Sequence, residues 1–136
     1  MRLLSVLFAA ISLIAFAPGV QARKAELVDP APVMVPAGLS QQALVKDIKR
    51  TLAGRGWQVS QEQPGVIDST LHLREHMAKI RVTYDERQVS FAYVDSSKLD
   101  FAEKKGRRYI HGNYLGWIGY LVSDLSTNME LSSEEQ

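Results

Sequence analysis

Apolar and polar residues alternate with a period of two along four stretches in the middle of the chain. These stretches cover residues 57–60, 67–74, 78–84 and 89–93, and short segments rich in glycine, proline or charge separate them. Such alternation predicts strands with one apolar and one polar face. Because the connections are short, the four strands are expected to form an antiparallel meander.

The stretches on either side of this region have helical spacing instead. Leu44, Ile48 and Leu52 recur on one face after Ser40, a residue type that favours a helix N-cap, and Gly54 and Gly56 then end the pattern. A second helix is predicted over about residues 109–129, where a wider apolar stripe runs through Ile110, Tyr114, Trp117, Leu121 and Leu125.

The predicted element order is β-α-β-β-β-β-α, with a short edge strand at residues 33–35. Two helices on one face of an antiparallel meander of about four to five strands make a two-layer α+β sandwich. The single domain is expected to span residues 33–129. A flexible lead-in at 23–32 precedes it, a polar tail at 130–136 follows it, and the charged stretch 95–108 is expected to be a loop.

The first 22 residues have the pattern of a secretory signal peptide. Arg2 precedes an apolar run over residues 3–17, Pro18-Gly19 ends it, and Val20-Gln21-Ala22 supplies small residues for cleavage. A membrane span needs about 20 apolar residues, more than this run contains. We therefore expect cleavage after Ala22, a periplasmic or secreted mature protein, and no membrane span in the mature form.

Charge and cysteine content narrow the function classes. The chain has 16 basic and 15 acidic residues, so removing Arg2 with the signal peptide leaves 15 of each. A formally neutral domain argues against nucleic acid, which calls for a basic patch. With no cysteine there is no disulfide, no zinc site built on thiolates and no lipidated cysteine.

Two catalytic or metal hypotheses can be stated on residue types alone. His72, His76 and His111 invite a zinc site, but the first two lie about 13 Å apart along a straight strand, so surface or structural roles are favoured. Asp95, Ser96 and His111 are the types used in a hydrolytic triad, although a turn at the end of a strand explains Asp95 and Ser96 equally well. No residue is predicted to be catalytic, and no metal or cofactor is expected.

Two surfaces invite an interaction hypothesis. Arg74, Lys79 and Arg81 cluster near one hairpin on the polar face of the sheet, which is either a solvated face or a binding surface. Gly112, Gly116 and Gly119 interrupt the second helix, where each glycine costs about 1 kcal/mol relative to alanine. Close packing of this helix on the sheet is the favoured explanation, and a contact between two chains is the alternative.

Several motifs also occur together in order. They are Gly56-Trp57, Pro64-Gly65-Val66-Ile67, Arg74-x-His76-x-Ala78-x-Ile80, Tyr93-x-Asp95-Ser96-x-x-Leu99 and Ile110-His111-x-x-Tyr114-x-x-Trp117. Over residues 33–125 the chain resembles a family of small exported proteobacterial proteins, some of them lipoproteins, with no assigned function. Its layout is also similar to helix-grip modules of accessory lipoproteins in outer-membrane assembly.

The resemblance implies a cluster of polar and aromatic residues where the second helix begins. Together with the basic residues of the sheet face, the candidate interaction residues are Arg74, His76, Lys79, Arg81, Asp95, Ser96, His111, Tyr114 and Trp117.

The leading hypothesis is a noncatalytic binding or scaffold module of the bacterial cell envelope, monomeric or weakly dimeric. Its partner would be an envelope protein, a glycan or a lipid head group, met on the open sheet face or in the groove between the helices. A small hydrolase or metal-dependent enzyme using Asp95, Ser96 and His111, and a homodimer-forming structural protein, are the alternatives.

Overall fold

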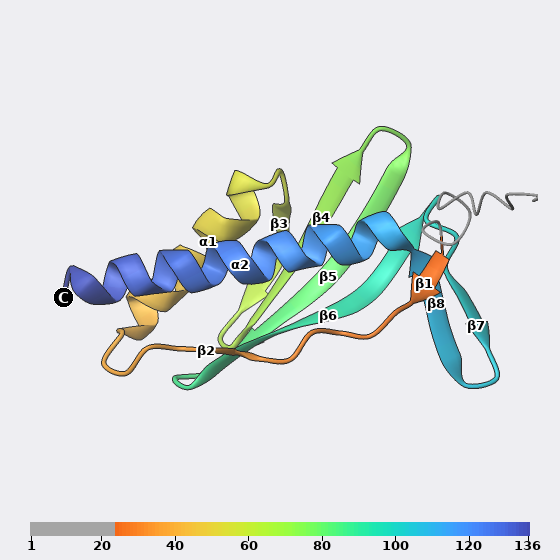
Figure 1. Ribbon diagram of the computed structural model, residues 1–136. Helices are drawn as coiled ribbons and strands as arrows, with labels where there is room; N and C mark the ends of the chain where they lie inside the picture. Colours follow the sequence, from red (N-terminus) through yellow and green to blue (C-terminus); the bar gives the residue numbers. More distant parts are fainter. Residues whose placement is uncertain (1–23) are drawn as a thin grey trace, which may run out of the picture.

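The computed structural model describes residues 24–136, so the predicted signal peptide and its cleavage site lie outside the described residues. Ten elements follow one another (Figure 1): β1 (Lys24–Glu26), β2 (Val33–Met34), α1 (Gln41–Gly54), β3 (Gln58–Gln63), β4 (Val66–Leu73), β5 (His76–Tyr84), β6 (Gln88–Ser97), β7 (Ala102–Lys104), β8 (Arg107–His111) and α2 (Gly112–Glu134).

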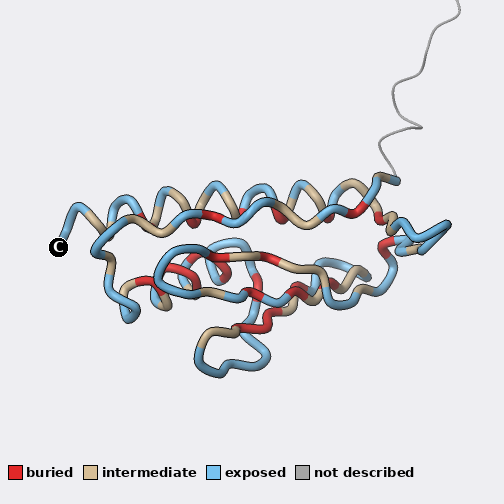
Figure 2. Tube along the Cα trace, turned by 90° about the horizontal axis from the view of Figure 1, so that it is seen from below, coloured by how far each residue is buried: buried red, intermediate tan, exposed pale blue. Residues whose placement is uncertain are grey.

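The predicted α+β fold with an antiparallel meander is confirmed. Five strands form one sheet in the order β2-β6-β5-β4-β3, and both helices lie on the same side of it, α2 along its length (Figures 1 and 2). The inward side chains of β4 and β5 face each other in register, Ile67 against Val82 and Leu71 against Ala78. All four are at most 6 % exposed, so the alternation read from the sequence marks the core side of the central strands.

Helix α1 begins and ends where its sequence predicts. Ser40 is the N-cap, and its Oγ accepts a hydrogen bond from the backbone N–H of Ala43 at 3.1 Å. Beyond the helix, Gly56 has a φ of +84°, a left-handed conformation that costs glycine nothing. This turn delivers Trp57 into the core, where it is 3 % exposed.

The charged stretch 95–108 was expected to be a loop, and that expectation is wrong. Residues 95–97 complete β6, and β7 and β8 form a hairpin through Lys105-Gly106, both with positive φ. Two consecutive left-handed residues give the turn a twist that matches its strands. The short strands carry Lys, Glu and Arg, which hides the period of two from sequence analysis.

The predicted lead-in at 23–32 is also partly ordered. Residues 24–26 form β1, which pairs antiparallel with β8 and completes a second, three-stranded sheet in the order β1-β8-β7. Leu27 is 4 % exposed, and its backbone N–H donates to the carbonyl of Arg108 at 2.8 Å. Burial of one leucine and main-chain pairing therefore hold a segment that its prolines had suggested would be loose.

The second helix starts later and ends later than predicted. Tyr109, Ile110 and His111 belong to β8, while the expected polar tail continues the helix to Glu134. Ser132 in this tail donates to the buried Asp47 carboxylate of α1 at 2.9 Å, and Asn128 donates to Thr51 Oγ1 at 3.0 Å. These hydrogen bonds close the seam between the helices and explain why the helix persists.

Gly116 and Gly119 of α2 do not pack against the sheet, contrary to the favoured prediction. Among the described residues, a Cβ added at Gly116 or Gly119 would have no atom within 4 Å other than those of its chain neighbours and of the nearby backbone of α2. Both positions are exposed, so no close packing within one chain compensates for the helix stability that the two glycines cost. No helix formed by residues 24–136 is long and apolar enough to cross a membrane.

On the sheet face away from the helices, one residue that the alternation over residues 67–74 places on the polar side is buried. Asp68 is 2 % exposed and accepts two hydrogen bonds from Arg81, at 2.8 and 3.1 Å. This bidentate pair lowers the pKa of Asp68, because the guanidinium favours the ionised carboxylate. The polar face thus contains a specific ion pair between β4 and β5.

Candidate functional site

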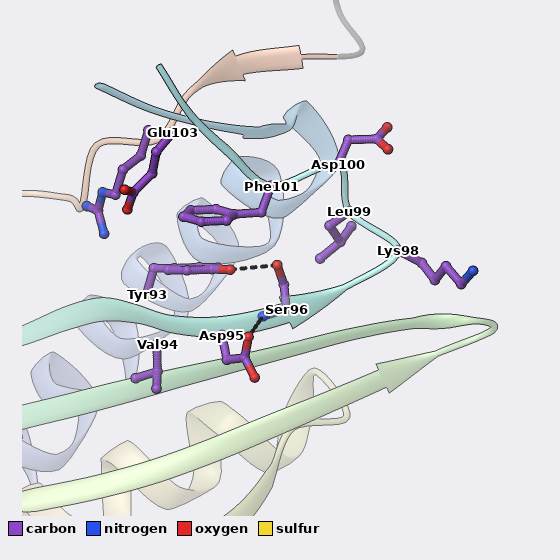
Figure 3. Close-up of a pocket in the computed structure, with 10 residues that line it drawn as sticks. Tyr93, Val94, Asp95, Ser96, Lys98, Leu99, Asp100, Phe101 and Glu103 are labelled. Carbon is purple, nitrogen blue, oxygen red and sulfur yellow. Dashed lines mark hydrogen bonds between the residues drawn. The ribbon is translucent and has the colours of Figure 1, made fainter. Parts of the chain in front are cut away.

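A cavity of about 570 Å³ opens between the end of β6 and the β7–β8 hairpin (Figure 3). We call it the β6–β7 pocket. Its lining consists of Tyr93, Val94, Asp95, Ser96, Lys98, Leu99, Asp100, Phe101, Glu103 and Arg108. Of the candidate residues named from the sequence, Asp95 and Ser96 line this pocket.

A β-bulge builds one wall of the pocket. Lys79 on β5 pairs with Asp95 and Ile80 pairs with Tyr93, which leaves Val94 as an extra residue on β6. An inserted residue shifts the alternation by one position, so Tyr93 and Ser96 project from the same side. Their hydroxyl groups are hydrogen-bonded at 2.7 Å.

Aromatic rings back the pocket. The ring of Tyr93 stacks on Phe101 with centroids 4.8 Å apart and planes 12° apart, and Tyr114 of α2 meets Tyr93 edge-on at 5.6 Å. The backbone N–H of Tyr93 donates to Asp29 at 3.0 Å, which fixes the strand beneath the ring. Phe101 remains 38 % exposed, so the fixed stack presents an apolar surface to the pocket.

The loop from β6 to β7 is held in a strained conformation. Lys98 and Asp100 have φ of 62° and 56°, values that side-chain-bearing residues rarely adopt. Leu99 between them is 2 % exposed, and its carbonyl accepts from the N–H of His111 at 2.8 Å. Anchoring of Leu99 therefore sets the rim of the pocket, and Figure 3 shows Lys98 and Asp100 turned away from the aromatic stack.

Charges of both signs line the pocket. Glu103 and Arg108 are directly opposite in the β7–β8 register, so their side chains leave the same face of the hairpin. The guanidinium of Arg108 also reaches Asp29 at 3.5 Å. Asp95, Lys98 and Asp100 also belong to the lining, but Figure 3 shows their charged groups pointing away from the aromatic stack.

The three residues of the hydrolase hypothesis each contact something other than one another. Asp95 accepts from the backbone N–H of Ser96 at 2.8 Å, and Ser96 Oγ contacts Tyr93. His111 is the N-cap of α2, where its Nδ1 accepts from the N–H of Asn113 at 3.1 Å. A serine nucleophile needs a base within hydrogen-bond reach, and the hydrogen bonds of the described residues supply no such base to Ser96.

The phenol beside Ser96 is not a base either. Burial raises the pKa of the Tyr93 phenol, and the negative charge of Asp95 raises it further, although the hydrogen bond with Ser96 and the positive Arg108 oppose the change. Tyr93 is therefore neutral over the physiological range. Together the Tyr93 and Ser96 hydroxyls form a neutral donor and acceptor pair.

His76 and Trp117 form a second, separate cluster. Nδ1 of His76 lies 2.8 Å from the carbonyl oxygen of Lys98, which can only accept, so this nitrogen carries the proton. The same ring lies 6.5 Å from that of Trp117. His76 therefore contacts the backbone of the pocket rim at Lys98, and neither His76 nor Trp117 lines the pocket.

The remaining candidate residues are spread over other surfaces. Arg74 occupies the β4–β5 turn with φ of 56°, Lys79 lies opposite Asp95 and Thr70 in the sheet, and Arg81 pairs with Asp68. Tyr114 is 2 % exposed, and burial raises the pKa of its phenol well above the usual value. The structure thus divides the polar cluster predicted at the start of the second helix, because Asp95 and Ser96 line the pocket whereas His76, His111, Tyr114 and Trp117 do not.

The three histidines lie in separate surroundings. Within residues 24–136, no group of three or more His, Asp or Glu side chains could hold a metal ion. His72 lies opposite Met77 across β4 and β5, while His76 and His111 have the contacts described above.

Sequence analysis missed Phe101, Glu103 and Arg108, which complete the pocket. Their charged stretch predicts a loop, and a loop gives no strand pairing that would place Glu103 opposite Arg108. The turn signal Lys105-Gly106 between charged residues was the available evidence for a hairpin.

The fold and the pocket together define a small α+β domain in which the β7–β8 hairpin of a second, three-stranded sheet lies beside the end of β6 and borders an open pocket of mixed polar and aromatic lining. Comparison of the chain with protein-family models, curated proteins and solved structures finds no match. The resemblance to exported proteobacterial proteins stays a prediction.

Proposed function

We propose that this chain is an exported binding protein of the bacterial cell envelope that works without catalysis, and that the β6–β7 pocket is its ligand site. The observation that carries the proposal is the fixed Tyr93–Phe101 stack with charged and hydroxyl groups around it. Ligand pockets typically combine an apolar surface with a few placed polar groups. The predicted signal peptide supports an envelope location.

Strain at the pocket rim supports the same proposal. Glycine at positions 98 and 100 would adopt the left-handed conformation without steric cost. The chain instead keeps a lysine and an aspartate there, both of which line the cavity. Unfavourable backbone conformations of this kind concentrate at binding sites.

The proposal is tested by amide NMR of the ¹⁵N-labelled protein mixed with a bacterial envelope extract. We expect shift changes to cluster at residues 93–103 and 107–108, and to disappear in Phe101→Ala. Tyr120→Ala is the matched control, because Tyr120 is an exposed aromatic residue on α2, outside the pocket. Changes confined to the open sheet face, or the absence of any change, would contradict the proposed site.

The hydrolase alternative makes a different prediction. If Ser96 were a nucleophile, Ser96→Ala would abolish turnover of an ester or amide substrate. Under our proposal Ser96→Ala leaves extract-induced shifts in place, weakened by one lost hydrogen bond of about 1 kcal/mol. Turnover that depends on both Ser96 and His111 would refute the noncatalytic proposal.

The homodimer alternative is favoured by one observation, the exposure of Gly116 and Gly119 on α2. These glycines destabilise the helix, and no contact within one chain compensates for that loss of stability. A second chain packed closely on them would compensate for it. Sedimentation equilibrium decides between the two states. A monomer at millimolar concentration would exclude this role.

A further inference from the structure

The polar groups of the β6–β7 pocket restrict what it can bind. Glu103 offers only acceptors, Arg108 offers only donors, and the two leave the same face of the hairpin. The hydroxyls of Tyr93 and Ser96 can do either. A matching ligand therefore needs groups that donate and accept side by side.

Charge excludes the simplest ionic ligands. An anion placed against the aromatic stack would meet the carboxylate of Glu103, and a cation would meet the guanidinium of Arg108. A neutral molecule rich in hydroxyl groups avoids both repulsions. Adjacent hydroxyls can donate to a carboxylate and accept from a guanidinium, and such charge-assisted hydrogen bonds are the stronger kind.

The aromatic surface adds a requirement for an apolar face. Phe101 is 38 % exposed, while Tyr93 lies parallel to it at 4.8 Å and holds it in place. An exposed ring of this kind receives C–H groups. Because the ring is already ordered, binding costs little conformational entropy.

From these features we infer that the β6–β7 pocket binds a neutral saccharide, whose C–H face rests on Phe101 and whose hydroxyls bridge Glu103 and Arg108. The inference rests on the proposed function and names its ligand class. A pyranose ring combines an apolar face with neighbouring hydroxyls that both donate and accept. The cavity of about 570 Å³ lies within the roughly 300–1,000 Å³ range of small-molecule sites.

The test is an NMR titration of the purified protein with maltotriose, cellotriose and triacetylchitotriose, against glycylglycine, spermidine and inorganic phosphate. We expect at least one trisaccharide to shift the amides of residues 93–103, with an affinity unchanged by added salt, because no net charge is neutralised on binding. Shifts at these residues by glycylglycine, spermidine or phosphate alone would overturn the saccharide class while leaving the pocket as a binding site. If none of the three trisaccharides shifts these amides, the inference is overturned as well.

Matched variants locate the site. Phe101→Leu keeps an apolar side chain but removes the aromatic face, so saccharide affinity should fall about tenfold, a loss of about 1.4 kcal/mol. Tyr120→Leu applies the same kind of change to an exposed aromatic residue outside the pocket and should leave affinity unchanged. Equal affinities of Phe101→Leu and the unaltered protein would contradict the contact, provided both unfold at the same temperature.

If the envelope extract also leaves the pocket amides unmoved, the proposed function fails with the inference. If the extract moves them and no saccharide does, only the inference fails.

Discussion

Replacing Gly116 and Gly119 of α2 by alanine should stabilise the protein. Both glycines lie inside the helix, away from its ends, and an added Cβ would have no atom within 4 Å beyond its chain neighbours and the nearby backbone of α2. Glycine costs about 1 kcal/mol relative to alanine in a helix interior, partly because it loses more backbone entropy on folding. With no clash to subtract, each substitution should return nearly this full amount.

The double variant should therefore gain about 2 kcal/mol, because the helix-propensity gain applies at each position and neither new methyl group has a tertiary neighbour to clash with. For a domain of this size, that gain raises the melting temperature by roughly 8 °C. Urea unfolding followed by tryptophan fluorescence, with calorimetry, measures both quantities.

Gly56→Ala is the control for this pair. Its φ of +84° is left-handed, and its new Cβ would lie 3.7 Å from Leu71, so strain rather than space decides the outcome. That variant should lose about 1–2 kcal/mol. The reasoning is refuted if the α2 double variant is no more stable than the original protein. A loss of stability that grows with protein concentration would instead reveal a second chain packed on these glycines.

Three further predictions concern the pocket and the sheet. Leu99→Ala removes a side chain that is 2 % exposed beneath the pocket rim. It should cost about 3 kcal/mol in urea unfolding, and a loss below about 1 kcal/mol would show that Leu99 does not anchor the loop. The lowered pKa of Asp68 means that its stabilising effect is present at neutral pH and is lost as pH falls below the ordinary carboxylate value of about 4. Asp68→Asn should thus flatten the acid limb of the stability profile, leaving the slope from Asp85 and Asp124, whose pKa values are also lowered by hydrogen bonds. An acid limb as steep as that of the unaltered protein would contradict this assignment. Burial raises the pKa of Tyr114, so alkaline absorbance titration should show this phenol ionising only after the exposed tyrosines. Tyr114→Phe should remove one tyrosine from this late ionisation, to which Tyr93, whose pKa is also raised, contributes as well. Early ionisation of every tyrosine would show that Tyr114 is not buried.

The sequence was sufficient for the parts of the fold in which the local pattern and the tertiary contacts agree. Ser40, Gly56 and the alternation in β4 and β5 each predict the structure they form. In these segments the side-chain period, the cap and the turn residue point to the same element.

Elsewhere a distant partner decides the local structure. β1 and β8 pair although most of the chain lies between them in the sequence. The local pattern of apolar and polar residues gives no sign of that contact. Similarly, the helix end near Ser132 is fixed by Asp47 of α1. Short-range patterns carry no information about such partners.

The pocket was only partly predictable for the same reason. Asp95 and Ser96 drew attention as polar residues at a strand end, but the bulge at Val94 places Ser96 beside Tyr93. A one-residue shift reverses which side chains share a face. Phe101 and Arg108 join the site only because the hairpin folds back beside β6.

The pairing of β1 with β8 also has a consequence for the order of folding. Glu26 meets Tyr109 and Lys24 meets His111, so the second sheet stays incomplete until two segments far apart in the sequence have come together. Contacts of such long sequence separation form late, because the closure entropy of the intervening loop must be paid first. Asp29, which holds both Tyr93 and Arg108, lies on the segment that docks in this step. We therefore expect the pocket to be assembled at the end of folding, and ligand binding to report on completion of the domain.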